Sequence, residues 1–226
     1  MAREKLKKPK SKLRELIESL LIAVLAAFFI RAFFIQAFKI PTGSMEDTLL
    51  EGDFLFVNKF IYGAKVPFTD WHLLKLRDPK QGDVVVFKYP VNRKLDYIKR
   101  VIAVGGQTVE IKDKVVYVDS IPFKNAPHTK FIQNTVLAKG LPEYEIYPPR
   151  QKWNKDNYGP FKIPEGYLFC MGDNRDNSLD SRYWGTVPRS DVIGEALIIY
   201  WSWDLTMPYY KFFTKVRWSR VADVIR

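Results

Sequence analysis

The sequence is poor in the residues on which many catalytic and structural centres depend, with one cysteine and two histidines among 226 residues. A single cysteine, Cys170, excludes an internal disulfide framework and a cysteine-rich metal site. The two histidines, His72 and His128, lie in polar segments and are expected at the surface. A Ser-His-Asp triad therefore has little from which to be built.

The net charge of +11 is unevenly distributed along the chain. Residues 1–15 hold seven basic and two acidic side chains, so this short stub carries +5 and the rest of the chain +6. Anionic lipids attract a basic patch that adjoins an apolar segment on the cytoplasmic face of a bilayer. No RNA-binding signature, zinc finger or basic zipper accompanies the charge, and we expect no nucleic-acid partner.

One long apolar run, from Leu20 to Phe38, follows the stub, and no second run of comparable length exists. Nineteen helical residues at about 1.5 Å each span about 28 Å, close to the hydrocarbon thickness, which predicts a transmembrane helix over residues 20–38. Arg31 lies near the outer end of this helix and can snorkel to headgroups or water. The positive-inside rule places the N-terminus in the cytoplasm and the body outside, with the lipid bilayer as a partner.

Two other interpretations of the apolar run compete with a retained anchor. A cleavable signal peptide also has a basic start, but apolar residues continue beyond Arg31 and no clear small-residue cleavage site follows. A buried core helix is the second alternative. The stretch from Leu20 to Ile30 has no polar face and adjoins a basic flank, which counts against it.

The residues after 38 form short β-branched or aromatic runs that Gly, Pro, Asn or Asp separates, as in DFLFVNKF, GDVVVFKYP and EALIIYWSW. This pattern predicts a mostly β, antiparallel body. Between about Phe123 and Pro164 the composition shifts to Pro, Asn, Lys and Tyr, which indicates an inserted subdomain or a long surface excursion. The aromatics of WSWDLTMPYYKFF are either ordinary core residues or residues at a membrane interface.

Two residues could carry chemistry, although each has a plainer interpretation. Ser44 follows Gly43 in the segment FKIPTGSMEDTLLEGD, where a sharp turn can expose its hydroxyl, but serine in such a turn is usually only a turn former. Lys99 lies in the predicted strand LDYIKRVIAV, on one face with Tyr97 and Val101. Burial would lower its pKa and make it a usable base, whereas the plainer interpretation is a solvated edge-strand lysine beside Arg100.

The third segment of interest is the polar loop CMGDNRDNSLDSRYWGTVP, residues 170–188. Its acids do not follow the spacing of a calcium-binding loop, and we expect no metal and no cofactor. Internal hydrogen bonds and ion pairs are the simpler explanation, with Asp180 and Arg182 as one pair. The residues assigned to this structural loop are Asp173, Asn174, Arg175, Asp180 and Arg182.

Together, PTGSM after an apolar run, DYIKRVIAVGGQTVEI and GDNRDNSLDSRYWGTVP resemble bacterial type I signal peptidases. The resemblance runs from the apolar run to the final RWSRV and is weakest over the insert. It implies a membrane-anchored serine endopeptidase in the bacterial cytoplasmic membrane, with its catalytic body on the outer side. Its substrates would be exported preproteins that have small residues before the cut, as in Ala-x-Ala.

The same resemblance assigns roles to individual residues. Ser44 would be the nucleophile, Lys99 the general base and Ser178 the residue that orients the lysine amine. The Thr42 hydroxyl and the Ser44 N–H would form the oxyanion hole. The implied substrate pockets contain Phe38, Ile40, Pro41, Met45, Leu49, Val86, Tyr97 and Ile98.

The implied fold is a β-rich catalytic core, residues 39–107 and 165–226, with a smaller inserted β subdomain over residues 108–164. Residues 1–19 would then be the cytoplasmic stub and the start of the anchor helix. The sequence departs from the family at Thr42, where serine is usual, and at Asp47, where proline is common and a looser backbone is expected. Many relatives have an additional membrane span, whereas this chain has one candidate.

Two rival functions remain open at this point. A self-cleaving repressor also uses a Ser/Lys pair, but it needs a DNA-binding N-terminal domain, and the apolar run occupies that place. An anchored β-rich binding or scaffold module would need no catalysis, and Ser44 and Lys99 would only pack. Substitution of either residue separates the scaffold from the peptidase, because only the peptidase would lose processing of a precursor.

Overall fold

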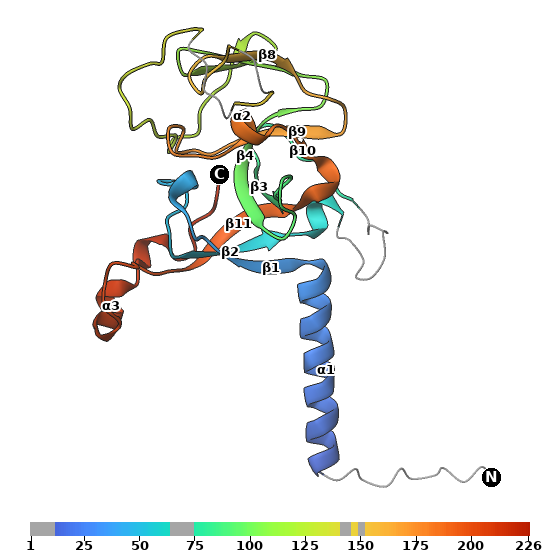
Figure 1. Cartoon of the computed structure of the whole chain (residues 1–226). Coiled ribbons are helices and arrows are strands. Elements are labelled where there is room, and N and C mark those ends of the chain that lie inside the picture. Colours follow the sequence, from blue (N-terminus) through green and yellow to red (C-terminus); the bar gives the residue numbers. More distant parts are fainter. Residues whose placement is uncertain (1–11, 64–74, 141–145, 149–151) are drawn as a thin grey trace, which may run out of the picture.

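The computed structural model describes residues 12–63, 75–140, 146–148 and 152–226. The predictions that concern His72 and the basic residues before Lys12 lie outside these ranges. The protein is mostly β, as predicted, and has two antiparallel sheets with a helix that projects from one of them (Figure 1). The helices are α1 (Lys12–Phe33), α2 (Ser181–Trp184) and α3 (Phe212–Lys215).

The larger sheet has seven strands in the order β1-β2-β11-β3-β4-β9-β10. Their bounds are β1 (Ile35–Lys39), β2 (Asp53–Asn58), β3 (Val84–Lys88), β4 (Asp96–Val104), β9 (Tyr167–Met171), β10 (Val187–Pro188) and β11 (Val192–Ser202). Because β4 lies between β3 and β9, its backbone groups are paired on both sides. This central position explains why eight of its nine residues are buried or half-buried. It also explains why β4 is the strand that can hold a desolvated lysine.

The predicted helix over residues 20–38 is wrong at its C-terminal end. Helix α1 ends at Phe33, and Ile35–Lys39 forms β1, which pairs with β2 along its whole length. The side chains of β1 alternate between exposed and half-buried, the period of an edge strand. Pairing with β2 satisfies backbone groups that a longer helix would have bonded internally, so the sheet overrides the apolar run.

Within the described residues, no helix reaches the length and hydropathy that a bilayer-crossing helix requires.

The smaller sheet has the strand order β7-β6-β5-β8 and lies entirely between residues 108 and 162. Its strands are β5 (Thr108–Lys112), β6 (Val115–Val118), β7 (Ile121–Pro122) and β8 (Tyr158–Lys162). Its buried face joins Ile102, Phe169 and Met171 of the larger sheet in one apolar cluster. The smaller sheet is therefore packed on the ends of β4 and β9 through a shared core.

Candidate active site

Ser44 lies in a single turn of 3-10 helix, Gly43–Met45, that follows β1 directly. Met45 and Leu49 are fully buried in a core cluster, and the Leu49 N–H donates to the Met45 carbonyl at 2.6 Å. The two ends of the segment from Ile40 to Asp53 are joined by a hydrogen bond, in which the Ile40 N–H donates to the Asp53 carbonyl at 2.9 Å. Ser44 is thus presented half-buried on a turn whose two flanks are anchored in the core.

Lys99 reaches this turn from β4. Its side chain is only 3% exposed, and its Nζ lies 2.5 Å from the Ser44 Oγ and 5.5 Å from the centre of the Tyr97 ring. The interpretation of Lys99 as a solvated edge-strand lysine is wrong, because β4 is a central strand and both Lys99 and Arg100 are buried. The strand order brings together two side chains that are 55 residues apart in the sequence.

Burial determines the ionisation of Lys99. Desolvation of the ammonium lowers the pKa of Lys99 from 10.5 to about 8. Asp180, Cys170 and Asp173 oppose this effect in part, and Arg182 adds to it. With a pKa of about 8, a minor fraction of the amine in contact with Ser44 is neutral at pH 7 and can accept a proton.

The loop that follows β9 holds the Ser44 turn from the other side. The Asn174 N–H donates to the Ser44 carbonyl at 3.2 Å, and the Asn174 amide donates to the Gly43 carbonyl at 3.1 Å and to the Glu46 carboxylate at 3.0 Å. Asn174 is fully buried, so these bonds are made in a dry environment. Asn174 was assigned to this loop from the sequence, but its contact with the Ser44 turn was not foreseen.

A buried ion pair connects the same loop to β4. Arg100 donates from Nε and Nη2 to the two Asp173 carboxylate oxygens, at 2.8 and 2.6 Å, and the Thr48 hydroxyl donates to the same carboxylate at 2.7 Å. Arg100 is 2% exposed and Asp173 is fully buried. No role for Arg100 was predicted from the sequence. A second cation next to Lys99 in an apolar strand is nevertheless a signal for a buried acidic partner.

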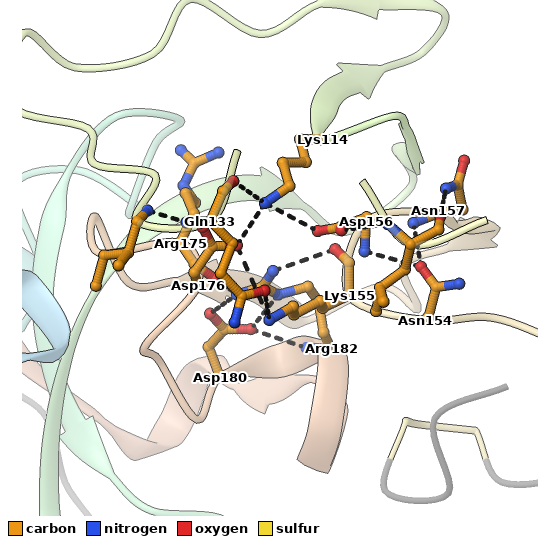
Figure 2. Close-up of polar contacts among 12 residues, drawn as sticks. Lys114, Gln133, Asn154, Lys155, Asp156, Asn157, Arg175, Asp176, Asp180 and Arg182 are labelled. Carbon is orange, nitrogen blue, oxygen red and sulfur yellow. Dashed lines mark hydrogen bonds and ion pairs between the residues drawn. The ribbon is translucent and has the colours of Figure 1, made fainter. Parts of the chain in front are cut away.

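Asp180 and Arg182 form the ion pair that the loop sequence suggested, with Nη2 and a carboxylate oxygen 2.8 Å apart. The Asp180 carboxylate also accepts from the Arg182 N–H and so caps α2. Burial raises the pKa of Asp180, but the charge and the hydrogen bonds of Arg182, together with the other hydrogen bonds to this carboxylate, lower it by more. The pKa of Asp180 therefore lies below its ordinary value. Figure 2 shows this pair beside a second polar group that contains Lys114, Asp156 and Asp176.

The side chains of Ser178 and Arg175 are both buried in this loop. The Ser178 hydroxyl helps to lower the pKa of Asp180, and the structure provides no hydrogen bond from Ser178 to the Lys99 amine. The Arg175 guanidinium has no hydrogen-bond partner among the described residues, and desolvation lowers the pKa of Arg175 to about 10. Its main chain is fixed, because the Arg175 carbonyl accepts from Arg182 at 2.6 Å.

Thr42 precedes the turn in an extended conformation, with its hydroxyl oxygen 3.5 Å from the Ser44 Oγ. Thr42 is exposed, so its hydroxyl can be reached from solvent. The residues expected in the substrate pockets divide into two groups. Those buried beneath the surface are Ile40, Met45, Leu49 and Val86. Those with accessible surface are Phe38, Pro41, Tyr97 and Ile98.

Asp47 has a φ of 73°, in the left-handed region that proline cannot adopt. Proline could therefore not replace Asp47 without a change in the backbone at this position. Lys130 lies 3.3 Å from the Glu46 carboxylate and 3.8 Å from that of Asp47, which brings the segment before β8 against this turn.

His128 is exposed, as expected from the sequence. In the part of the chain that the structure describes, no three His, Cys, Asp or Glu side chains gather as metal ligands.

Gly172 belongs to the loop after β9 and lies where this loop packs against the Ser44 turn. A Cβ on Gly172 would lie 2.2 Å from the Ser178 Oγ and 2.4 Å from the Ser44 carbonyl oxygen, so one segment must move. We expect Gly172→Ala to lower kcat/KM roughly 10- to 100-fold by displacing Ser44 from Lys99, which steady-state kinetics will measure. Gly140→Ala is the control, because it adds strain at a φ of 85° without meeting any atom. Wild-type kcat/KM in Gly172→Ala would contradict the prediction.

A serine hydroxyl in contact with a buried amine of lowered pKa, on a β scaffold, is characteristic of serine hydrolases that use lysine in place of histidine. The family described as "Signal peptidase, peptidase S26" matches residues 13–201. Signal peptidase I of Aquifex aeolicus is 37% identical, over 84% of this chain and 85% of its own. Signal peptidase I of Buchnera aphidicola from Acyrthosiphon pisum is 34% identical, over 98% of this chain and 85% of its own. The chain therefore belongs to the signal peptidase family, peptidase S26.

Among solved structures, a signal peptidase I from Enterococcus faecalis V583 has 25% sequence identity and a TM-score of 0.40, covering 53% of this chain and 97% of that one.

Proposed function

We propose that this peptidase removes signal peptides from exported preproteins with Ser44 as nucleophile and Lys99 as general base. As a member of its family, the chain is a serine endopeptidase that acts on signal peptides. The observation that carries the two residue assignments is the 2.5 Å contact between the Ser44 Oγ and the Nζ of a lysine that is 3% exposed. A charged amine could not act as a base, and the burial of Lys99 favours its neutral form.

The chemistry begins when neutral Lys99 accepts the Ser44 proton while Oγ attacks the scissile carbonyl carbon. The resulting oxyanion would lie between the Thr42 hydroxyl and the Ser44 N–H, and one such donor contributes about 2.7–4 kcal/mol. When the carbon–nitrogen bond breaks, the Lys99 ammonium returns the proton to the leaving amine, and the acyl group stays on Ser44. Lys99, neutral again, then takes a proton from water while the water oxygen attacks the ester carbon. When the bond to Oγ breaks, Lys99 returns this proton to the Ser44 oxygen, which releases the signal peptide and restores the hydroxyl.

The substrates in this proposal have small residues before the cut, of the Ala-x-Ala type. The accessible side chains of Phe38, Pro41, Tyr97 and Ile98 would contact them, above a floor made by the buried Met45 and Leu49. We assign Ser178 to orientation of the lysine amine, because its buried hydroxyl lies in the loop that packs against the Ser44 turn.

The pH dependence of cleavage tests the dyad. We expect kcat/KM for an Ala-x-Ala precursor in detergent to rise with pH and to level off above an apparent pKa of about 8, because only neutral Lys99 is a base. Ser44→Ala should be inactive at every pH. Lys112→Ala is the matched control, since Lys112 is an exposed lysine of the smaller sheet. A midpoint near 10.5, or residual processing by Ser44→Ala, would contradict the proposal.

We further propose that α1 anchors the chain in the cytoplasmic membrane as a single pass, with the N-terminus in the cytoplasm. This proposal is supported by the apolar surface of the helix. Every large apolar side chain between Leu13 and Ile30 is at least half exposed. Such a surface favours lipid over water. Arg31 at its C-terminal end is exposed and can reach headgroups.

Labelling of introduced cysteines tests this topology, because the native Cys170 is fully buried. We expect a membrane-impermeant maleimide to label Val115→Cys on spheroplasts at once and Lys12→Cys only after permeabilisation. Release of the protein by carbonate washing, or equal labelling of both variants on intact spheroplasts, would overturn the anchor.

The segment from Trp201 to Phe213 would contact the same membrane through its exposed aromatics. Tyr210 is 84% exposed and Phe213 is 79% exposed, so these two are not core residues. Figure 1 shows α3 at the tip of a projection on the side of the body opposite the smaller sheet. Trp and Tyr are favoured at a membrane interface.

A further inference from the structure

Helix α1 continues into the catalytic body with no flexible linker. Only Phe34 separates the last residue of α1 from the first residue of β1. The Phe34 N–H donates to the Ile30 carbonyl at 2.9 Å, as in one more helical turn, and the Phe34 carbonyl accepts from the Lys59 N–H at 2.9 Å. The helical and sheet hydrogen-bond ladders therefore meet at a single residue.

The Phe34 side chain also fixes this junction. Its ring stacks on Phe60, with centroids 5.3 Å apart and planes inclined by 19°, and tilts against Phe29 of α1 at 5.8 Å. Phe60 is itself held, because the Asn58 side-chain oxygen accepts from the N–H groups of Phe60 and Ile61 at 3.0 and 3.2 Å. Offset aromatic pairs of this kind contribute about 0.5–1.5 kcal/mol beyond their buried area.

The path from the junction to Ser44 is equally constrained. All five residues of β1 pair with β2, from Ile35 opposite Asn58 to Lys39 opposite Phe54. Ile40 follows, 2% exposed and bonded to Asp53, and the turn with Ser44 begins three residues later. Five strand residues at about 3.3 Å each make β1 a paired segment of about 17 Å, and only three further residues lead from its end to the active-site turn.

We infer that Phe34, Phe60 and Asn58 are positioning residues that hold α1 at one orientation to the sheet, so that Ser44 acts at one fixed height above the bilayer. This inference rests on the proposed function and on α1 as its anchor. A precursor held in the same membrane presents its scissile bond at a defined depth. A rigid junction keeps Ser44 at that depth, so that the enzyme cleaves this bond and not its neighbours. Loss of rigidity would spread Ser44 over many heights and lower its effective concentration at the correct bond.

A merely structural stack would act differently, because it would affect all substrates alike. The test therefore compares two substrates with the same cleavage site in the full-length enzyme. One is a precursor reconstituted with the enzyme in vesicles of phosphatidylethanolamine and phosphatidylglycerol, and the other is a short soluble peptide in detergent. The variants are Phe34→Ala and an insertion of Gly-Ser-Gly between Phe34 and Ile35. The insertion keeps α1 and the pairing of β1 with β2, but Phe34 can no longer bond to Ile30 and Lys59 at the same time.

We expect both variants to cleave the peptide within about twofold of wild type. Cleavage of the precursor in vesicles should fall at least about tenfold, and mass spectrometry of the products should show additional cut sites. Phe34→Tyr should keep the wild-type rate and fidelity, because it retains the stacked ring. Val91→Ala, at an exposed position, is the neutral control. Equal losses on both substrates, or unchanged precursor cleavage by the insertion variant, would overturn the inference. Failure of the wild-type enzyme to cut the peptide would instead contradict the proposed function.

Discussion

Lys99→Met abolishes proteolysis and at the same time makes the folded protein more stable. Methionine fills nearly the same volume as lysine but cannot accept the Ser44 proton. In serine peptidases the loss of one member of the catalytic unit lowers kcat by roughly four to six orders of magnitude, and we expect a loss of that size in kcat/KM. The assay is cleavage of a precursor at a pH near 9, where the wild-type base is neutral.

The gain in stability follows from the lowered pKa of Lys99, about 8 in the folded protein against 10.5 for a free lysine. Below pH 8 both the folded and the unfolded protein carry the proton, and the folded protein bears the full cost of a buried ammonium. Between pH 8 and 10.5 the unfolded state binds more protons, so wild-type stability rises with pH and the cost disappears. At pH 7 the free energy of unfolding of Lys99→Met should therefore exceed that of wild type by roughly 2–3 kcal/mol.

Chemical denaturation of both proteins at pH 7 and at pH 10.5 measures this difference. The two stabilities should converge at the higher pH. Lys112→Met, at an exposed position, should change neither stability nor activity. A Lys99→Met protein that is less stable than wild type at pH 7 would mean that the ammonium is a structural ion-pair partner, and the base assignment would fail.

The long motifs of the sequence led to Ser44 and Lys99 as the proposed dyad, and its short alternating runs predicted the β-rich body. The sequence could not predict that Lys99 is buried, because burial depends on which strands flank β4. That order places β3 on one side and β9, some 70 residues away in the chain, on the other. Local patterning alone fits an edge strand equally well.

Two other features depended on contacts between distant segments. The apolar run continued through Phe38, but pairing with β2 decided that residues 35–39 form a strand. Similarly, Asp173 and Asn174 were recognisable as members of a polar loop, whereas their partners, Arg100 and the carbonyls of Gly43 and Ser44, come from segments more than 70 residues earlier. Hydrogen-bond partners at such separations have no local signature.

Asp173→Ala has the second-largest expected effect, and it acts on stability as well as on activity. The substitution leaves the Arg100 guanidinium buried without its carboxylate and removes the acceptor of the Thr48 hydroxyl. Loss of one partner of a buried ion pair costs about 3–5 kcal/mol of stability, which urea denaturation will measure. We also expect kcat/KM to fall at least 100-fold, because the loop at residues 172–174 no longer holds the Ser44 turn. Asp78→Ala removes the ion pairs of an exposed carboxylate with Lys75 and Arg189 and should change stability by less than about 1 kcal/mol.

A double variant separates the two roles of this pair. Replacement of both partners, as in Arg100→Met with Asp173→Leu, removes the unpaired charge, and buried ion pairs replaced by apolar residues of similar size are often as stable as the original. We expect the double variant to regain most of the stability that Asp173→Ala loses. Its kcat/KM should remain low, because leucine cannot accept from Thr48 and the loop that carries Asn174 is no longer tied to the strand that carries Lys99. If activity returned together with stability, the ion pair would serve only the fold, and the alignment of Ser44 with Lys99 would have to depend on the Asn174 contacts alone.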